Sequence, residues 1–501
     1  MRSGSLWIDT TGARAERPQL VGEHVFDVAV LGGGITGLTT ALLLKQQGVR
    51  VAVLEAGRVG GGASGNNTAK VTALQATVHS RIRAHRGAEA AACYAASQQA
   101  AVEKVAELAE GLDCGLQRRT ARTCAFGDAQ LPAVEQEADA AERAGLPVDT
   151  GGKPDLPFPV SGSVSLPGQI ALHPVRYVEG LAAAFDGGDC AIFENSRVLS
   201  VHEGAPCRAR TAHGEVRADR VVVATHYPLL DRGLYFARLA PARSYCVAAR
   251  VPDPPQDMVI SAGSPTRSVN SWQDRVVVGG QGHPVGQRGV DEQRYEQLAE
   301  FARRSWEGAE VTHRWSAQDP TSHDSFPVVG SYTPGSSRLF VASGFMKWGL
   351  SGGTAAGMLL ADLLGGRDNP WARAFSPTRF PAASAPTLLR QNAQVAVDFA
   401  GDRLQPGSSG SDDLPRGQAR VVRDGADLTG VYRDEQGGAH AVSLRCTHLG
   451  CLVRFNAAER SWDCPCHGSR FDVDGSVLEG PATTPLPTKE VPGASGQQEG
   501  R

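Results

Sequence analysis

Apolar residues first cluster at 26–30, where the run FDVAV predicts a short buried strand. The glycine-rich sequence LGGGITG follows at once, and LTTALLLKQQG then predicts an apolar helix that ends at Gly48. VRVAVLEAG predicts a second strand that ends in an acidic residue, Glu55. Because the connections are short, these elements indicate a βαβ unit over residues 26–57.

The middle of the chain alternates between helical and strand-like patterns. Residues 85–110 are alanine-rich with helical character, and residues 114–320 mix short β-like runs with turn signals. One run predicts a buried strand at Val221–Val223 that ends at Ala224 and Thr225. Near residue 350, SSRLFVASGFMKWGLSGGTAAGMLLADLL predicts a strand, a glycine-rich turn and a helix.

The composition changes after Phe375. Residues 376–415 form a predicted linker that holds a proline-broken connector, one possible amphipathic helix (TLLRQNAQVAVDFAGDRL) and the flexible stretch QPGSSGSDDLP. Short strands and turns then predict a small all-β domain over 416–492, and we expect the tail at 493–501 to be disordered. The first domain therefore spans 1–375.

Charge and hydropathy narrow the class of protein. The 501-residue chain carries 50 lysines and arginines against 53 aspartates and glutamates, a formal charge of −3. This balance provides no broad basic field for nucleic acid or an anionic membrane. No apolar stretch approaches the roughly 20 residues that span a bilayer. Since the first twenty residues also lack the apolar core of a signal peptide, we expect a cytoplasmic protein.

Gly32, Gly34 and Gly37 form a G-x-G-x-x-G motif between the predicted strand and helix. The first glycine permits a tight turn, the second lets the backbone approach a pyrophosphate, and the third permits close helix–strand packing. The helix N-terminus supplies NH donors to phosphate, and Glu55 stands where a carboxylate can bind ribose hydroxyls. The motif predicts a bound dinucleotide but does not by itself separate FAD from NAD.

Three further segments do separate them. AGRVGGGASGNNTAKVTA after Glu55, DRVVVAT at 219–225 and SGFMKWGLSGGTAAG at 343–357 resemble the D-amino acid oxidase-like family of FAD enzymes, which includes glycine and sarcosine oxidases. The resemblance covers roughly residues 26–375. It implies an α/β FAD-binding domain of the Rossmann type with an inserted α+β substrate domain. Because the late turn GFMKWG holds no cysteine, we expect non-covalent FAD.

The same resemblance implies which residues contact the FAD. A loop after the second strand wraps the pyrophosphate and ribitol, and a later strand end passes near the dinucleotide. The late glycine-rich turn aims helix-start NH groups at the pyrimidine edge of the flavin. The implied FAD-binding residues are Gly32, Gly34, Ile35, Thr36, Gly37, Glu55, Ala56, Gly62, Ala63, Ser64, Thr68, Ala69, Lys70, Val71, Ala224, Thr225, Gly344, Gly349, Leu350 and Ser351.

Ten cysteines divide into two groups. Six are scattered without ligand spacing and are interpreted as free thiols: Cys93, Cys114, Cys124, Cys190, Cys207 and Cys246. The other four lie in two loops, CTHLGC at 446–451 and CPCHGS at 464–469. Each loop offers one cysteine and one histidine as ligands, plus a further cysteine. A Rieske [2Fe–2S] centre needs two thiolates and two imidazoles, while a zinc site or a disulfide knot is the alternative.

The spacing C-x-H-x2-C followed by C-x-C-H, with GPAT at 480–483, resembles the Rieske family. The match implies four cluster ligands and one disulfide: Cys446 and Cys464 on one iron, His448 and His467 on the other, and a bond between Cys451 and Cys466. Ser469 then donates a hydrogen bond to a cluster sulfur, whereas Phe471 replaces the tyrosine of high-potential members. We therefore expect one cluster with a potential in the middle of the range of roughly −150 to +300 mV.

The candidates for catalysis are Lys70 in NTAKVT, His283 in GGQGH, and Lys347 and Trp348 in the late turn. The alternative for each is a surface lysine, a turn histidine or a packed tryptophan. The segment 313–330 resembles the family's return to the flavin domain, which implies further residues that line the site: Arg314, Trp315, Gln318 and Asp324. No carboxylate-binding arginine is identifiable, which leaves the substrate class open.

Three functions fit this cofactor pair. In the first, FAD takes a hydride from an amine or amino acid and passes electrons singly to the Rieske centre and an external one-electron carrier. In the second, ferredoxin or a reductase fills the cluster, which delivers electrons to FAD for substrate reduction or oxygen activation. The third is a non-catalytic electron-transfer or redox-sensing module. A ring-hydroxylating oxygenase is disfavoured because it needs a mononuclear iron domain, and the C-terminal cluster leaves no room for one.

Overall fold

The computed structural model describes residues 1–401, 413–424 and 427–491, so the glycine- and serine-rich part of the predicted linker and the predicted tail lie outside the described residues. The chain divides into two compact units. Unit 1 comprises Met1–Gly282 and Tyr295–Thr387, and unit 2 comprises His283–Arg294 and Leu388–Arg501. The division falls later than the predicted boundary at Phe375. It also assigns an internal segment, 283–294, to the C-terminal unit.

An eight-stranded sheet in unit 1 contains the predicted βαβ unit as β2 (Gly22–Leu31), α2 (Ile35–Lys45) and β3 (Val51–Leu54). Its strand order is β16-β17-β10-β2-β3-β7, with β9 attached to β10 and β8 to β9. The central strands β17, β10, β2, β3 and β7 run parallel, which agrees with the predicted α/β fold class. The other bounds are β7 Ala191–Phe193, β8 Ser200–His202, β9 Cys207–Arg210, β10 Gly214–Val223, β16 Val328–Ser331 and β17 Leu339–Ser343.

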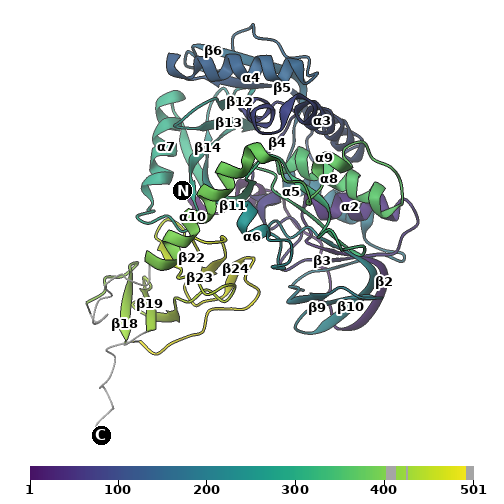
Figure 1. Cartoon of the computed structure of the whole chain (residues 1–501). Coiled ribbons are helices and arrows are strands. Elements are labelled where there is room, and N and C mark those ends of the chain that lie inside the picture. Colours follow the sequence, from purple (N-terminus) through teal and green to yellow (C-terminus); the bar gives the residue numbers. More distant parts are fainter. Residues whose placement is uncertain (402–412, 425–426, 492–501) are drawn as a thin grey trace. The chain divides into compact units, whose positions relative to one another are not determined.

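Helices α2 and α8 (Gly349–Leu364) lie side by side (Figure 1). A Cβ atom built at Gly353 would lie 2.6 Å from Thr36 Oγ1, and one at Gly357 would lie 2.7 Å from Thr39 Cγ2. The two helices reach this separation because α8 presents glycine to α2. The helix α5 (Pro174–Phe185) also packs on α2.

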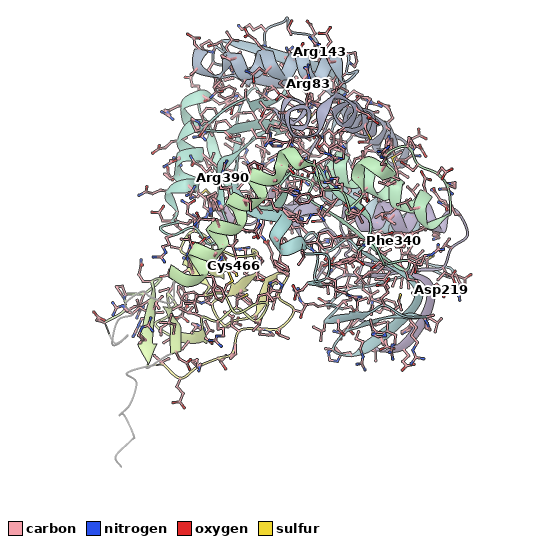
Figure 2. The ribbon with its side chains drawn as sticks, viewed as in Figure 1. Arg83, Arg143, Asp219, Phe340, Arg390 and Cys466 are labelled. Carbon is pink, nitrogen blue, oxygen red and sulfur yellow. A yellow bond between two sulfur atoms is a disulfide. The ribbon has the colours of Figure 1, made fainter. Side chains whose placement is uncertain are left out.

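The second sheet of unit 1 is nine-stranded, with the order β1-β15-β11-β14-β13-β12-β5-β6-β4. Two helices, α3 (Val78–Leu108) and α4 (Leu131–Arg143), pack together, and Asp139 on α4 pairs with Arg83 and Arg143 at 2.6 Å each (Figure 2). The strand bounds are β1 Arg2–Ser3, β4 Lys70–Val71, β5 Gln117–Ala125, β6 Gly162–Ala171, β11 Leu239–Arg250, β12 Met258–Ser261, β13 Arg267–Trp272, β14 Arg275–Pro284 and β15 Glu310–Ser322.

The remaining helices before α10 are α1 Leu6–Asp9, α6 Tyr235–Arg238, α7 Gln293–Ser305, which begins in the last two residues of the 283–294 segment, and α9 Ala372–Phe375, with 3-10 turns at Ala63–Gly65, Asp128–Gln130 and Ala382–Ser384. The alanine-rich helix α3 begins earlier than predicted and is interrupted at Gly87, whose φ of +84° is readily adopted by glycine. Among the described residues, no helix has the length and apolar character that a bilayer crossing requires.

Unit 2 contains two small antiparallel sheets. The first has the order β18-β19-β20 and the second β21-β22-β23-β24. The predicted amphipathic helix forms as α10 (Ala385–Gly401), and its residue Val395 packs against the core around Trp462. The strand bounds are β18 Ala419–Asp424, β19 Asp427–Arg433, β20 Ala439–Ser443, β21 Arg454–Asn456, β22 Ser461–Asp463, β23 Arg470–Asp472 and β24 Val477–Glu479.

The close approach of α2 and α8 predicts that Gly357→Ala destabilises unit 1. Alanine improves helix propensity by roughly 1 kcal/mol, but its methyl group overlaps Thr39, and overpacking of a tight interface costs about 1–3 kcal/mol. We expect a lower thermal unfolding midpoint by circular dichroism. Gly335→Ala is the control, because a methyl group there meets no atom within 4 Å. Equal midpoints for Gly357→Ala and the wild type would contradict the prediction.

Candidate functional site

In the turn between β2 and α2, backbone segments pack directly against one another without intervening side chains. A Cβ atom at Gly37 would lie 2.0 Å from the carbonyl oxygen of Gly32, and one at Gly32 would lie 2.4 Å from that of Ala224. Gly32 also has a φ of +111°, which side-chain-bearing residues rarely adopt. The turn therefore places the first residues of α2 beside the end of β10, with NH groups available for a phosphate.

Two further predicted segments meet this turn. The carboxylate of Glu55, at the end of β3, accepts hydrogen bonds from the backbone NH of Gly33 at 2.7 Å and of Gly57 at 2.8 Å. Burial raises the pKa of Glu55, and these two bonds favour its ionised form. Ser64 Oγ accepts from the backbone NH of Ile35 at 3.0 Å. A glycine cradle, a carboxylate and a helix start thus lie together, a combination that fits the adenosine diphosphate half of FAD.

The loop after β3 is fixed by residues that the sequence analysis did not identify. Glu194 accepts from the backbone NH of Val59 at 2.7 Å. The N-terminal segment supplies two donors: Ser5 Oγ binds the Gly65 carbonyl at 2.6 Å, and the Trp7 indole binds that of Asn67 at 2.8 Å. In the sequence, these residues stand out only as polar or amphipathic residues in apolar surroundings. That pattern does not indicate which residue each of them contacts.

The late turn before α8 has a strained backbone. Met346 and Lys347 have φ values of +53° and +76°, which non-glycine residues adopt only when the surroundings impose them. Inside α8, Ser351 donates to the Thr72 carbonyl at 3.0 Å and accepts from Gln75 Nε2 at 3.0 Å. The first turn of α8 is thereby fixed to the segment after β4. Such strain is concentrated at functional sites, in keeping with the role predicted for this turn.

The positive charges of Lys70 and Lys347 both favour the ionised form of one buried thiol, that of Cys246, and so oppose the effect of burial on its pKa. The Lys70 ammonium is buried and donates to the Val259 carbonyl at 2.8 Å and to Ser268 Oγ. Burial lowers the pKa of Lys70 to about 7 and raises that of Cys246 to about 12. Lys347 is exposed and donates to Ser244 Oγ at 2.6 Å.

The other residues predicted near the flavin make the following contacts. His283 belongs to unit 2, with Nδ1 2.8 Å from the Pro284 carbonyl, and the Trp348 ring is packed in the core of unit 1. Trp315 donates its indole NH to the Asn66 carbonyl at 3.1 Å, which holds the loop after β3. The remaining three make other contacts: Asp324 pairs with Arg379 at 2.7 Å, Arg314 lies over the Tyr295 ring, and the Gln318 carbonyl lies 2.7 Å from His226 Nε2.

In unit 2, the two cysteine–histidine loops have the same backbone turn. The Cys446 carbonyl accepts from the NH of Gly450 at 3.0 Å, and the Cys464 carbonyl accepts from that of Gly468 at 3.1 Å. Both glycines have positive φ, +74° and +79°. Each loop also closes through its first cysteine, whose NH donates 2.8 Å to the carbonyl of the loop's last residue, Cys451 or Ser469.

These turns bring the predicted ligands together. The Cys446 and Cys464 sulfurs share a hydrogen bond, which lowers the pKa of the first thiol and raises that of the second. The rings of His448 and His467 lie 5.0 Å apart between centroids, and both Nδ1 atoms are buried.

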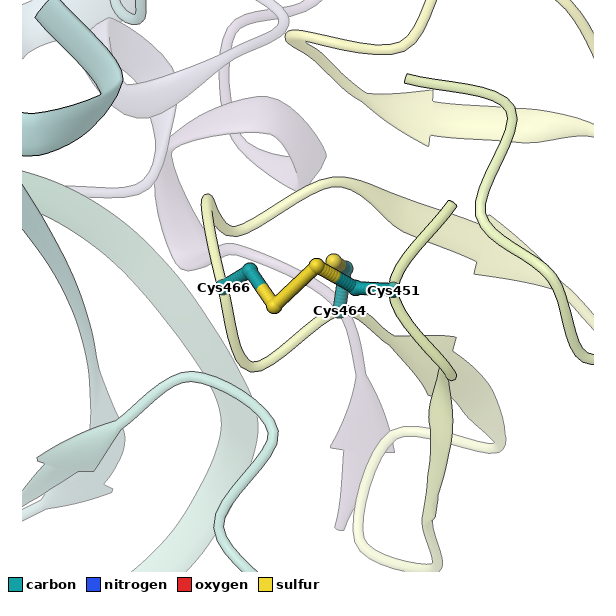
Figure 3. A group of neighbouring side chains, drawn as sticks. All are labelled: Cys451, Cys464 and Cys466. Carbon is teal, nitrogen blue, oxygen red and sulfur yellow. A yellow bond between two sulfur atoms is a disulfide. The ribbon is translucent and has the colours of Figure 1, made fainter. Parts of the chain in front are cut away.

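The remaining two cysteines of the loops form a disulfide. The sulfurs of Cys451, Cys464 and Cys466 lie within 4.8 Å of one another, and Cys451 is bonded to Cys466 (Figure 3). The six scattered cysteines form no disulfide. Two thiols and two imidazoles are left as donors, the set that would hold a [2Fe–2S] cluster by two sulfurs on one iron and two nitrogens on the other.

Polar contacts surround these donors. Ser469 Oγ accepts from the Ala482 NH at 3.0 Å, so its own proton is available to the Cys446 sulfur, and this contact helps to lower the Cys446 pKa. Phe471 is fully buried and offers no hydroxyl group. Beside Cys464, the Asp463 carboxylate accepts from Arg470 Nε at 3.0 Å, which ties β22 to β23.

Residues 27–363 match the family model described as FAD dependent oxidoreductase. The chain belongs to this family. In this FAD-dependent oxidoreductase, residues 408–490 match the Rieske [2Fe-2S] domain, so the protein uses FAD and one [2Fe–2S] cluster. The expectation drawn from the sequence resemblance is confirmed for both domains and both cofactors.

Relatives share the fold and the domain order. The chain is 31% identical over 481 residues to YhfW of Bacillus subtilis, a protein named for its Rieske 2Fe-2S centre, and the match covers 94% of each chain. Glycine oxidase from Geobacillus kaustophilus superposes with a TM-score of 0.59 and 23% identity, covering 71% of this chain and 99% of that one. L-proline dehydrogenase from P. horikoshii superposes with a TM-score of 0.60 and 16% identity, covering 72% and 98%. At these identities, the two solved structures establish the fold of the oxidoreductase part.

The Ser469 contact predicts that Ser469→Ala lowers the midpoint potential of the cluster. A hydrogen bond to a cluster sulfur stabilises the more negative, reduced state, so its loss disfavours reduction. A bond to a charged acceptor is worth about 1.5 kcal/mol, or roughly 60 mV for a one-electron couple. An EPR-monitored redox titration checks this shift, with Ser469→Thr as the control that keeps the hydroxyl. An unchanged potential in Ser469→Ala would exclude the bond.

Lys70 predicts a pH-dependent stability. Its pKa falls from the ordinary 10.5 to about 7 on folding, so between these values the unfolded chain binds more protons and stability rises with pH. Lys70→Met removes this dependence. The change in unfolding midpoint from wild type to Lys70→Met should therefore be most stabilising, or least destabilising, below pH 7, and should become less favourable as the pH rises. Thermal unfolding at about pH 6 and about pH 9 measures it. A pH-independent difference between the two proteins would rule out the lowered pKa.

Proposed function

We propose that this protein oxidises an amine or amino acid, with the substrate hydride going to FAD and the two electrons then passing singly through the Rieske cluster to an external carrier. One observation carries the proposal: a single chain joins an amino-acid-oxidase fold to a one-electron centre. A hydride brings two electrons, whereas a [2Fe–2S] cluster accepts one at a time. An enzyme that reduced only oxygen would not need the cluster.

The substrate class is supported by the fold neighbours and by one exposed cation. Glycine oxidase and L-proline dehydrogenase carry amino acids in their names. Lys347 stands in the strained turn before α8, where a Cβ at Gly282 would lie 3.2 Å from its Nζ atom. We assign Lys347 to bind the substrate carboxylate. Lys347 would supply the positive charge for carboxylate binding, a role for which no arginine is identifiable in the sequence.

The other roles follow from position. The G-x-G-x-x-G turn and Glu55 would hold the adenosine half of FAD, and the late turn with Ser351 would hold the flavin end. Lys70, whose neutral form is well populated near pH 7, takes up the proton of the substrate ammonium through the Ser268 hydroxyl. An amine must lose this proton before it can give up a hydride.

The test mixes the purified holoprotein anaerobically with pooled amines and amino acids. Flavin bleaching at its absorbance maximum, followed by the EPR signal of the reduced cluster, is the expected result, and division of the pool identifies the substrate. Lys347→Met should then raise KM for a carboxylate-bearing substrate by about tenfold or more, the equivalent of one charge-assisted hydrogen bond. If no pool bleaches the flavin, but a reduced ferredoxin fills the cluster and then the FAD, electrons flow in the opposite direction and the proposal is wrong.

A further inference from the structure

Residues 283–294, here called the support segment, interrupt the oxidoreductase domain in sequence but belong to unit 2 in space. Gly286 in this segment has a φ of +71°, and a Cβ built on it would lie 2.6 Å from both the N and Cα atoms of Pro465. Pro465 stands between Cys464 and Cys466 in the second cluster loop. The segment therefore packs its backbone directly against the chain that carries a predicted iron ligand.

Hydrogen bonds hold the support segment in this position. Arg454, which begins β21, donates from Nη1 to the Gly286 carbonyl at 2.9 Å and from Nη2 to Asp398 on α10 at 2.8 Å. Farther along, the Ala457 NH donates to the Val290 carbonyl at 3.2 Å. The side chain of Val290 is buried. Contacts at Gly286 and at Val290 thus fix the segment to the β21 end of the Rieske domain.

The contact at Pro465 bears on the cluster through the backbone of the second loop. Pro465 lies inside the turn that the Gly468 NH closes on the Cys464 carbonyl at 3.1 Å, and it directly precedes Cys466 of the disulfide. The immediate surroundings of the ligands are among the features that set the potential of an iron–sulfur cluster. A displacement of Pro465 shifts Cys464 and Cys466, because both are its neighbours in the chain. The segment can therefore alter the cluster without contacting a ligand side chain.

We propose that the support segment is a third structural element of the Rieske site, and that Gly286 is a positioning residue for the cluster. The oxidoreductase domain thereby contributes its own backbone to the environment of the iron centre. Because Gly286 has no side chain, the segment can approach Pro465 closely. This backbone contact supports the second cluster loop. This inference rests on the cluster and not on the identity of the substrate or the direction of electron flow.

Gly286→Ala and Gly289→Ala form a matched pair in the full-length holoprotein. Both glycines have a similar positive φ, +71° and +67°, so alanine brings similar backbone strain at each. Only Gly286 faces Pro465, whereas a Cβ at Gly289 meets no atom within 4 Å. We expect Gly286→Ala to shift both the midpoint potential and the EPR spectrum of the cluster, and Gly289→Ala to match the wild type. If both variants match the wild type, or both shift equally, the proposal is overturned.

Iron and FAD content cover the case in which Gly286→Ala cannot hold a full cluster. Loss of iron with FAD retained, and with iron retained in Gly289→Ala, supports a local role at the cluster. Loss of both cofactors indicates a general folding defect, and the decision then passes to a second pair. Arg454→Gln removes the bond to Gly286, while Asp398→Asn leaves that bond in place. A shift in potential for Arg454→Gln alone supports the proposal, and equal behaviour of this pair overturns it.

Discussion

The oxidoreductase part depends on one close approach, that of the first turn of α2 to the end of β2. A Cβ atom at Gly37 would lie only 2.0 Å from the carbonyl oxygen of Gly32. Any side chain at this position would therefore force the helix away from the sheet. This separation brings the NH groups at the start of α2 to the carboxyl ends of β2 and β10, where parallel sheets bind dinucleotides. It also sets α2 at the depth where α8 can pack on it, and α8 in turn begins at the late turn. Two elements more than 300 residues apart are thereby placed by the same contact.

The Rieske domain is stabilised differently, because its two small sheets have only a small hydrophobic core. Small domains bury a lower fraction of their surface than large ones and often need covalent or metal-based links. Here the ligand loops share one turn geometry, and Cys451–Cys466 joins them outside the ligand set. Cluster binding stabilises the folded domain, because the unfolded chain has no preformed site for the cluster. The second loop therefore has little freedom of its own, and a change in its support is transmitted to the ligands.

Features formed by residues close together in the sequence could be predicted, whereas features formed by distant residues could not. The G-x-G-x-x-G motif and the CTHLGC and CPCHGS loops are local, since the residues that make each turn lie within a few positions of one another. The anchoring contacts are not local. Glu194 binds the NH of a residue 135 positions earlier, and Gln75 binds Ser351 across 276 positions. Propensity and periodicity contain no information on such pairs, and the assignment of residues 283–294 to the C-terminal unit was missed for the same reason.

Burial acts in opposite directions on the ionisable groups near the predicted flavin site. It lowers the pKa of Lys70 to about 7 and raises those of Cys124 and Cys246 to about 12, because desolvation disfavours a charge of either sign. At neutral pH the thiols are uncharged and Lys70 is neutral in a large fraction of molecules. Lys347, in contrast, is exposed and donates a hydrogen bond to Ser244 Oγ. The proposed division of roles corresponds to this contrast in burial: the exposed Lys347 binds the substrate carboxylate, and the buried Lys70 takes up the ammonium proton through Ser268.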